Sequence, residues 1–384
     1  MAAAVALTVV AGIAAAIGPR TIATFLIAAV ALAALAALIG QSVEQVGERF
    51  GPGPTGLLQS ALGNLPELFV GIFALREGLV GVVQAALVGS ILANTLLVLG
   101  VAVLVGGLRH GDQSFTSDAP HMIGTLLLLA VAALLVPTLA SHLHTPAASH
   151  TGGLSGAVAI VLIGVYAMSI PYSLRGGSAL NPTEPAAPDA PDVSDVSKPA
   201  SLAVPESPEA PKPASPAAPE SPEPAGAARP GVWPLGLAIT LLAVGSLGAA
   251  VASDWFVGAL TPATHALGLS QTFTGLVIVA IASNAVENVV GIRFALTARP
   301  DYALSIILNS PLQIALLLTP LLVLVSHLTG PTQLTLVFPA LEVCALALAT
   351  IVVLVVLVDG KYVWLEGVAL IGLYCIVAAA FWWG

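Results

Sequence analysis

The chain has 384 residues, of which 57% are hydrophobic and only 8% are charged. Soluble domains carry about 25% charged residues, so the composition excludes an ordinary globular protein and predicts an all-α integral membrane protein. The formal net charge is −9, but eight of the 20 acidic residues lie in one polar segment, 184–223. Eleven basic residues without a basic patch argue against a nucleic-acid partner.

Eleven apolar stretches approach the roughly 20 residues that a helix needs to cross a bilayer. In chain order, we expect about 11 transmembrane helices, at 3–18, 21–41, 57–75, 79–106, 120–140, 153–171, 232–253, 270–292, 302–326, 333–358 and 363–382. The first stretch lacks the basic start of a signal peptide, and a second apolar stretch follows it at once. We therefore expect an additional short helix there.

The chain changes character after the sixth stretch, because 14 of the 29 prolines fall between Asn181 and Pro230. Ala, Ser, Glu and Asp fill much of the rest, and such a segment cannot bury enough apolar surface to offset the entropy of ordering it. We expect residues 175–231 to be a disordered, mildly acidic linker. Its simplest role is to join two halves, and a regulatory role is the alternative.

The basic residues predict the orientation. With eleven spans, nine of the 11 Lys and Arg residues fall on one side, and only Arg20 and Arg76 fall on the other. Without the long linker the ratio is six to two, and the positive-inside rule places the richer side in the cytoplasm. We therefore expect a multi-pass protein of the cell membrane, with its N-terminus and linker in the cytoplasm. A vacuolar membrane is the alternative in a cell with organelles.

The spans divide into two equal groups around the linker. We expect an additional N-terminal helix in 1–20, a first five-helix repeat in 21–174 and a second in 232–384. Because five is an odd number, the second group must enter the membrane from the opposite side. This arrangement predicts two inverted repeats in a 1 + 5 + 5 architecture.

One short pattern occurs in both halves, 220 residues apart: Asn64 and Glu67 in the first, Asn284 and Glu287 in the second. In each copy the two residues are three apart and share one face of a helix. A carboxylate within the bilayer is costly and usually functional. We expect these four residues to bind a cation and protons where the halves meet, with Glu67 and Glu287 as metal ligands. A polar contact between helices is the alternative.

A second polar cluster follows each glutamate, since Ser90 and Ser310 both come 23 residues after one. Asn94 lies one turn after Ser90, and Gln313 lies nearly one turn after Ser310. Hydroxyl and amide oxygens are neutral ligands for a hard cation, so we expect these four residues to be auxiliary to the site. Hydrogen bonds between helices would explain them equally well.

Three further acidic residues fall within or near the expected helices. Glu44 and Asp254 stand at the ends of the second and seventh expected helices, in roughly matching places. They line an ion path or lie at the solvated interface. Glu342 lies within the tenth expected helix and has no acidic counterpart in the fifth, so we expect it to be an auxiliary proton site.

The ligand types predict the transported ion. Two carboxylates with neutral oxygens, and no thiolate or imidazole, favour Ca²⁺ or another hard cation. Without the cation, two buried carboxylates repel each other and lose hydration, which favours their protonated forms. The same pair would then hold either the cation or protons, which predicts exchange. No nucleotide-binding or catalytic motif is present, so we expect neither an enzyme nor a cofactor.

These residues resemble the Ca²⁺/H⁺ antiporters of the cation/Ca²⁺ exchanger superfamily, which carry Gly-Asn-x-x-Glu in both repeats. Residues 63–67 match that motif in full, and 89–94, 97–100 and 359–367 are also similar to the family. The resemblance covers nearly all of 30–382 apart from the linker. It implies the 1 + 5 + 5 helices, a Ca²⁺ site at the two glutamates and H⁺ as the counter-ion.

The second half departs from the family pattern at several positions. Ser283 replaces the glycine of the motif, Asn288 stands where the family usually has His, and Asn309 lies in a segment that is typically Gly-Ser-Ser. These departures leave both carboxylates in place. We expect a secondary transporter that exports Ca²⁺ from the cytoplasm in exchange for H⁺, and exchange of Na⁺ or K⁺ for H⁺ is the alternative. The expected partners are Ca²⁺, H⁺ and the lipid bilayer, and nothing in the sequence indicates an oligomer.

Overall fold

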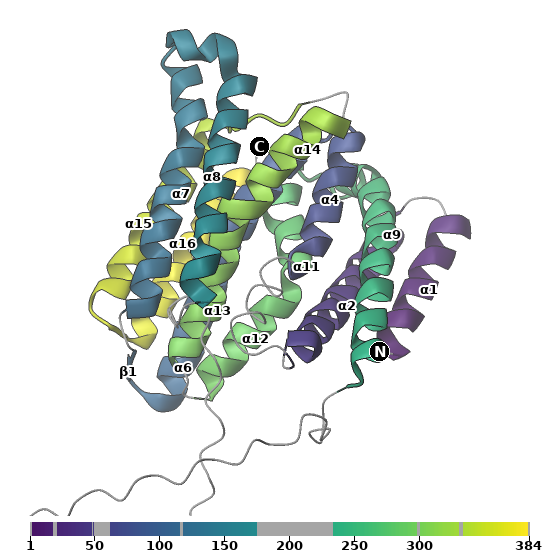
Figure 1. Ribbon diagram of the computed structural model, residues 1–384, viewed down its shortest axis with the longest axis horizontal. Helices are drawn as coiled ribbons and strands as arrows, with labels where there is room; N and C mark the ends of the chain where they lie inside the picture. The colour runs from purple at the N-terminus through teal and green to yellow at the C-terminus, as the bar shows by residue number, and fades with distance from the viewer. Residues whose placement is uncertain are drawn as a thin grey trace, which may run out of the picture. The chain divides into compact units, whose positions relative to one another are not determined.

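The computed structural model describes residues 2–17, 21–47, 49, 62–115, 118–174, 233–297, 300–329 and 333–382. The expected linker, 175–231, lies outside these residues. The described chain is almost entirely helical (Figure 1), as the sequence predicts. Two short strands, β1 (Gln113–Ser114) and β2 (Lys361–Tyr362), pair as a small antiparallel ladder, an addition that the all-α prediction did not include.

The elements of the first half follow one another in the expected order. They are α1 (Ala2–Ile17), α2 (Ile22–Gly47), α4 (Leu65–Arg76), α5 (Val80–Leu92), the π-helical segment η1 (Ala93–Val98), α6 (Leu99–His110), α7 (Asp118–His142), the 3₁₀ turn η2 (Pro146–His150) and α8 (Thr151–Leu174).

The second half repeats this order. Its elements are α9 (Leu235–Leu267), α10 (Gln271–Phe273), the π-helical segment η4 (Thr274–Val279), α11 (Ala280–Ser283), α12 (Ala285–Leu296), α13 (Pro300–Gln313), the π-helical segment η5 (Ile314–Leu318), α14 (Thr319–Thr329), α15 (Ala340–Val358) and α16 (Trp364–Trp382).

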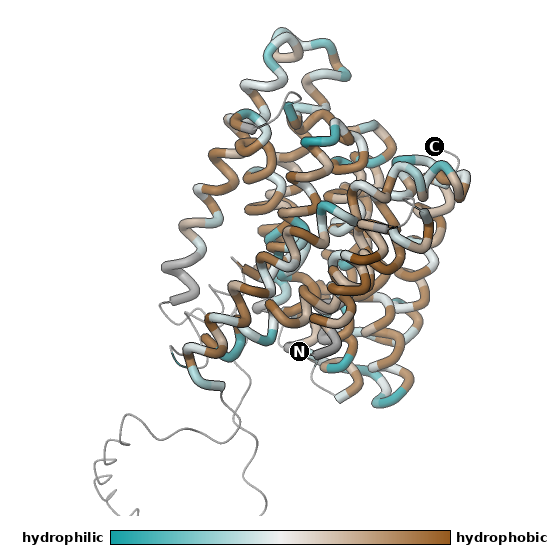
Figure 2. The backbone as a smooth tube through the Cα atoms, turned by 90° about the vertical axis from the view of Figure 1, so that its right-hand side faces the viewer, coloured by the Kyte–Doolittle hydropathy of each residue, from teal (hydrophilic) through white to brown (hydrophobic). Residues whose placement is uncertain are grey.

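Eight helices of the described chain are long and apolar enough to cross a membrane. They are Ile22–Val46, Val80–His110, Pro120–His142, Pro146–Ser169, Leu235–Leu267, Ala303–Leu328, Ala340–Val358 and Trp364–Trp382. Two shorter apolar helices, Ala4–Ala16 and Gln271–Ser283, accompany them. Hydrophobic residues follow the lengths of the helices and hydrophilic residues gather near many of their ends (Figure 2). These helices confirm the prediction of a helical membrane protein, and the count of 11 spans stays a prediction.

The bounds of the helices show the internal repeat directly. Adding 220 to the bounds of α4 gives those of α12, and the same offset carries η1 onto η5 to within one residue at its start. α2 and α9 also end at equivalent residues, Gly47 and Leu267. The two halves are therefore built on one plan, as the repeated motif predicts.

The two repeats run in opposite directions. α5, η1 and α6 form a continuous rod, Val80–His110, of 31 residues, about 46 Å long at 1.5 Å per residue. α4 ends at Arg76, just before this rod begins. At the far end of the rod, a ring nitrogen of His110 lies 3.0 Å from the carbonyl oxygen of Leu296, the last residue of α12. Thus α4 and α12 end at opposite faces of the molecule.

Two faces can be named from these contacts. The hairpin face holds the α4–α5 turn (77–79), the tip of the α7–α8 hairpin (143–150) and an extended segment, 333–339, that we call the strap. The strap joins the other two, because it is hydrogen-bonded to Gln84 of α5 and Thr138 of α7. The ladder face holds β1 and β2. Figure 1 shows the hairpin tip and β1 at opposite ends of the helices.

Three expected helix boundaries are wrong. The second expected helix continues past 41 to Gly47. α9 continues past Asp254 and ends at Leu267, because its stop signal is Gly268, which has a φ of +65° and caps the helix in the left-handed conformation. The tenth expected helix begins at Ala340 and not at 333. Pro339 stands before its first turn, and a proline disfavours helical geometry in the residue that precedes it.

Candidate functional site

Asn64 and Asn284 occupy the same kind of helix start in the two halves. Asn64 has φ −91° and ψ 18°, and Asn284 has φ −93° and ψ 10°, so neither continues a regular helix. The carbonyl of each accepts the first backbone hydrogen bond of the helix that follows, from Leu68 at 3.0 Å and from Asn288 at 3.1 Å. Each side chain is thereby placed at a break between helical segments, where polar groups are available to a ligand.

The side chain of Asn284 crosses from the second half to the first. Its Nδ2 donates to the Ser90 hydroxyl at 3.0 Å, and also to Ser283 Oγ at 3.2 Å and to the Ala280 carbonyl at 3.0 Å within its own segment. Asn284 is 1% exposed, so these bonds are shielded from water. The break of one repeat is therefore held against the continuous rod of the other.

Asn94 lies between the halves as well. Its Nδ2 donates to the Ser90 carbonyl at 2.9 Å and lies 3.4 Å from both Asn284 Oδ1 and Ser310 Oγ. Ser310 Oγ also lies 3.4 Å from Asn284 Oδ1. The carbonyl of Ser90 lies one turn before the π-helical segment η1, and the Asn94 side chain satisfies it.

A second bond between the halves joins Asn64 to Gln313. The Nδ2 of Asn64 donates to Gln313 Oε1 at 2.9 Å, and both side chains are buried. Six of the residues predicted for the site are thus buried and join the repeats in two hydrogen-bonded sets, the Asn64–Gln313 pair and a group of four around Asn284, which together we call the cluster. They are Asn64, Ser90, Asn94, Asn284, Ser310 and Gln313.

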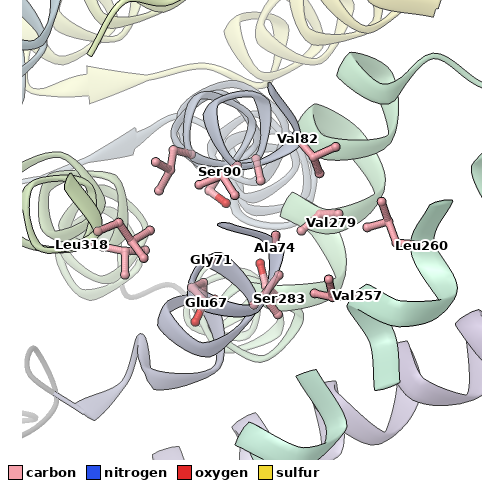
Figure 3. A pocket seen from close by; sticks show the side chains of 15 residues that line it. Glu67, Gly71, Ala74, Val82, Ser90, Val257, Leu260, Val279, Ser283 and Leu318 are labelled. Carbon is pink, nitrogen blue, oxygen red and sulfur yellow. The ribbon is translucent and has the colours of Figure 1, made fainter. Parts of the chain in front are cut away.

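Glu67 lines a pocket beside this cluster (Figure 3). It is 9% exposed, and Ser90 and Ser283 are the other polar residues among the 15 that line the pocket. The remaining 12 are Gly, Ala, Val and Leu residues. The lining extends along α4 from Glu67 to Ala74 and along α5 from Ser90 to Val82, towards the hairpin face. The pocket therefore extends from a carboxylate towards that face between apolar walls, and the lining residues nearest the face, Ala74 and Val82, are themselves buried.

The side chain of Glu287 lies outside the part of the chain that the structure describes. Its backbone is described, and it lies in α12 at the position that Glu67 has in α4. Its role at the site stays a prediction, supported by the equivalence of the two helices.

Close backbone packing brings the elements of the site together. A Cβ at Gly275 of η4 would lie 2.6 Å from the Val82 carbonyl oxygen, and one at Gly89 of α5 would overlap the backbone of Leu276. Only glycine allows such an approach. This crossing of α5 and η4 sets the separation between Ser90 and the break at Asn284.

The other predicted acidic residues lie apart from the cluster. Glu44 is exposed near the end of α2, and Asp254 is exposed within α9, so the prediction that they occupy matching helix ends is wrong. The repeat offset makes Thr264 the counterpart of Glu44. A single charge on an exposed helix face does not end a helix. Glu342 is buried but does not line the pocket.

Two residues of interest were not among the predicted site residues. Ser283 lines the pocket, and its replacement of the motif glycine was the available signal. Gln84 is 8% exposed and holds the strap, with its Nε2 2.9 Å from the carbonyls of both Thr335 and Val337. Its amide among the otherwise apolar residues 79–89 could have identified it.

The donor set suits a hard cation. Among the described residues, no group of three or more His, Cys, Asp and Glu side chains could hold a metal ion. A cation at this crossing would therefore depend on the carboxylate of Glu67 together with neutral hydroxyl, amide and carbonyl oxygens. Such ligands are typical of Ca²⁺ and not of Zn²⁺ or Cu⁺.

Comparison with known proteins places the chain among exchangers. The sodium/calcium exchanger protein family matches residues 20–175 and 237–383. A Ca(2+)/H(+) antiporter of Synechocystis sp. is 36% identical over 359 residues, covering 93% of this chain and 90% of the relative. The Ca(2+)/H(+) antiporter ChaA of Bacillus subtilis is 31% identical over 361 residues, covering 93% and 91%. The structure of native YfkE has a TM-score of 0.75 at 28% identity, covering 100% of this chain and 98% of that chain.

Proposed function

Because the chain belongs to the sodium/calcium exchanger protein family, we propose that it exchanges Ca²⁺ for H⁺ across a membrane. The two relatives described above are named Ca(2+)/H(+) antiporters. The observation that carries the proposal is the position of Glu67, a buried carboxyl beside amide and hydroxyl groups from both repeats. Secondary transporters place their binding sites at such a repeat interface.

Competition at the carboxylates explains the exchange. A carboxylate that releases its proton can ligate Ca²⁺, and one that holds a proton has lost its charge for the cation. Glu67 and Glu287 together match the charge of one divalent ion. Binding of Ca²⁺ therefore expels protons, and protonation expels Ca²⁺, so the two substrates share one site without both occupying it.

The pocket supports alternating access. Its lining runs from Glu67 towards the hairpin face, which supports an access path on that side. Closing the pocket and opening an equivalent path from the ladder face would carry the ion across. The inverted repeats provide two such paths from one sequence plan.

We place the protein in the cell membrane with the ladder face in the cytoplasm and the hairpin face outside. The support is the excess of Lys and Arg in the loops on the ladder side. A proton gradient directed into the cell would then drive Ca²⁺ out as protons enter. Exchange of Na⁺ or K⁺ for H⁺ is not favoured, because the relatives from Synechocystis sp. and Bacillus subtilis are named for Ca²⁺.

The test uses purified protein in liposomes that contain a pH-sensitive dye. Addition of Ca²⁺ should move protons, and Glu67→Gln should abolish that movement because the amide neither loses a proton nor carries a charge. Glu77→Gln is the matched control, since Glu77 is an exposed residue just after the same helix. If Na⁺ but not Ca²⁺ moves protons, the proposed substrate is wrong; if Glu67→Gln exchanges normally, the proposed site is wrong.

A further inference from the structure

Glu342 is a buried acid that the proposed exchange cycle does not use. It lies in the first turn of α15 and is 1% exposed. Its Oε2 has no hydrogen-bond partner among the described residues. An ionised carboxylate that is shielded from water and has no partner is unfavourable, so the group is suited to holding a proton.

We propose that Glu342 is a proton-binding group on a path from the hairpin face that is separate from the cation pocket. The inference rests on the proposed Ca²⁺/H⁺ exchange and adds a residue that loads protons for it. The pocket lining includes Glu67, Ser90 and Ser283 but does not include Glu342. Protons and Ca²⁺ would therefore approach the crossing by different routes.

The surroundings of Glu342 argue against a second cation site. The strap just before it has three consecutive carbonyls already in use, since Gln84 donates to Thr335 and Val337 and Thr138 donates to Leu336. Ca²⁺ takes six to eight oxygen ligands. One carboxyl with these carbonyls occupied cannot supply them, whereas a proton needs only the carboxyl.

The described elements that pack against α15 place no positively charged side chain beside Glu342. α15 packs against α5, η1, α7 and β2, and α5 and η1 carry no titratable side chain. α7 runs antiparallel to α15, because Thr138 meets the strap while Gly124 meets Leu354. α7 carries Asp118 and His121 near the C-terminal end of α15, away from Glu342, and its third titratable residue, His142, is exposed. The titratable residues of β2, Lys361 and Tyr362, also follow the C-terminal end of α15.

The position of α15 connects Glu342 with the ion site. α15 packs against α5 and η1, which carry Ser90 and Asn94. Gln84, bonded to the strap beside Glu342, lies six residues before Ser90, about 9 Å along the helix. Glu342 therefore lies on the hairpin side of the α5–η4 crossing, in a helix that packs against α5.

This arrangement occurs in one half only. The 220-residue offset makes Met122 the counterpart of Glu342 and Leu304 the counterpart of Gln84. The first repeat thus places apolar side chains where the second has the carboxyl and its neighbouring amide. The proton-binding group serves one face of the exchanger, which distinguishes the two otherwise similar half-cycles.

The test compares the pH profile of Ca²⁺-driven proton movement in liposomes for four proteins: the wild type and the Glu342→Gln, Glu342→Met and Glu342→Asp variants. The Gln and Met variants should still exchange, but half-maximal exchange should move to lower pH by about one unit, a tenfold change in proton concentration. The KM for Ca²⁺ at low pH should change less than twofold in both. Glu342→Asp should restore the wild-type profile, and the exposed-acid control Glu77→Gln should not shift it.

Each other outcome overturns the inference. An unchanged profile in Glu342→Gln and Glu342→Met means that the carboxyl only fills space. A large change in the KM for Ca²⁺ without a pH shift assigns Glu342 to the cation site. If the Gln and Met variants fail to fold while the Asp variant folds, the acid is a structural requirement. Wild-type protein that moves no protons with Ca²⁺ would instead defeat the proposed function, on which this inference rests.

Discussion

At the scale of single residues, two equivalent serines differ at the crossing of the repeats. Ser90 accepts a 3.0 Å bond from Asn284, whereas Ser310 lies 3.4 Å from Asn284 Oδ1 and from Asn94 Nδ2. Hydrogen bonds weaken with such lengthening. The 220-residue offset makes Asn64 the equivalent partner of Ser310, but Asn64 Nδ2 donates to Gln313 Oε1 at 2.9 Å instead. The hydrogen bonds of the site are therefore asymmetric, although the helices that carry them are equivalent in the two repeats.

This asymmetry predicts different costs for two matched substitutions. Ser90→Ala removes a buried bond between the halves worth about 1 kcal/mol, so the apparent affinity for Ca²⁺ should fall roughly fivefold. Ser310→Ala removes only the longer contacts and should change the affinity less than twofold. Titration of Ca²⁺-driven proton movement in liposomes measures both. Equal effects of the two variants would show that the Asn284–Ser90 bond does not hold the site.

Tyr362 gives a pH dependence outside the membrane-spanning helices. Burial, and then the neighbouring negative charge of Asp301, raise the pKa of Tyr362 from 10.0 to about 12. Between these values the unfolded chain loses the proton while the folded protein keeps it. The free energy of unfolding should therefore be at its full value below pH 10 and fall by about 2 to 3 kcal/mol as the pH rises to 12.

Thermal unfolding in detergent between pH 9 and pH 11 measures the first half of this loss. Tyr362→Phe keeps the ring that stacks on Phe115 and removes the ionisable hydroxyl. The variant should lose less stability than the wild type across that range. A parallel decline in both proteins would mean that other groups cause the alkaline sensitivity.

At the scale of elements, the crossing of α5 and η4 is where the structure tolerates the least change. A Cβ at Gly89 would overlap the backbone of Leu276, and a backbone cannot turn aside as a side chain can. Gly89→Ala should lower the free energy of unfolding by about 3 kcal/mol or more and abolish exchange. Thermal unfolding and transport measure the two effects.

Gly81→Ala is the matched control, because Gly81 lies in the same helix and a Cβ there meets nothing within 4 Å. Alanine favours a helix over glycine by roughly 0.5–1 kcal/mol, so this variant should be as stable as the wild type or slightly more stable. Similar losses in both variants would indicate that α5 needs glycine for a reason other than the crossing.

The sequence predicts much of this frame and misses its interruptions. The motif spacing predicts the equivalence of α4 and α12, and six of the predicted polar residues meet in the structure. The expected helix 270–292 is instead broken at Asn284, where the side chain bonds to Ser90 of the other half. Apolar periodicity cannot reveal a break that depends on a contact 194 residues away. The strap is a similar case, since side chains such as Gln84 satisfy its backbone.

At the scale of the whole molecule, inversion gives the exchanger two faces with related structures and different side chains. α4 ends at the hairpin face and α12 at the ladder face, so each motif helix points towards a different side. The Glu67 pocket extends towards the hairpin face. Which side of the membrane this pocket serves depends on which face is outside, and that assignment rests on the loop charges.

Labelling of single cysteines tests the orientation. Cys344 and Cys375 are free and exposed, so both are first replaced by serine. Ser149→Cys then places a thiol at the hairpin tip and Ser114→Cys places one in β1, and both positions are exposed. A membrane-impermeant maleimide added to intact cells should label residue 149 at once, and residue 114 only after the membrane is opened. The loop charges place the ladder side in the cytoplasm by six to two. The reverse labelling pattern would show that the protein has the opposite orientation in the membrane. The pocket of Glu67 would then face the cytoplasm.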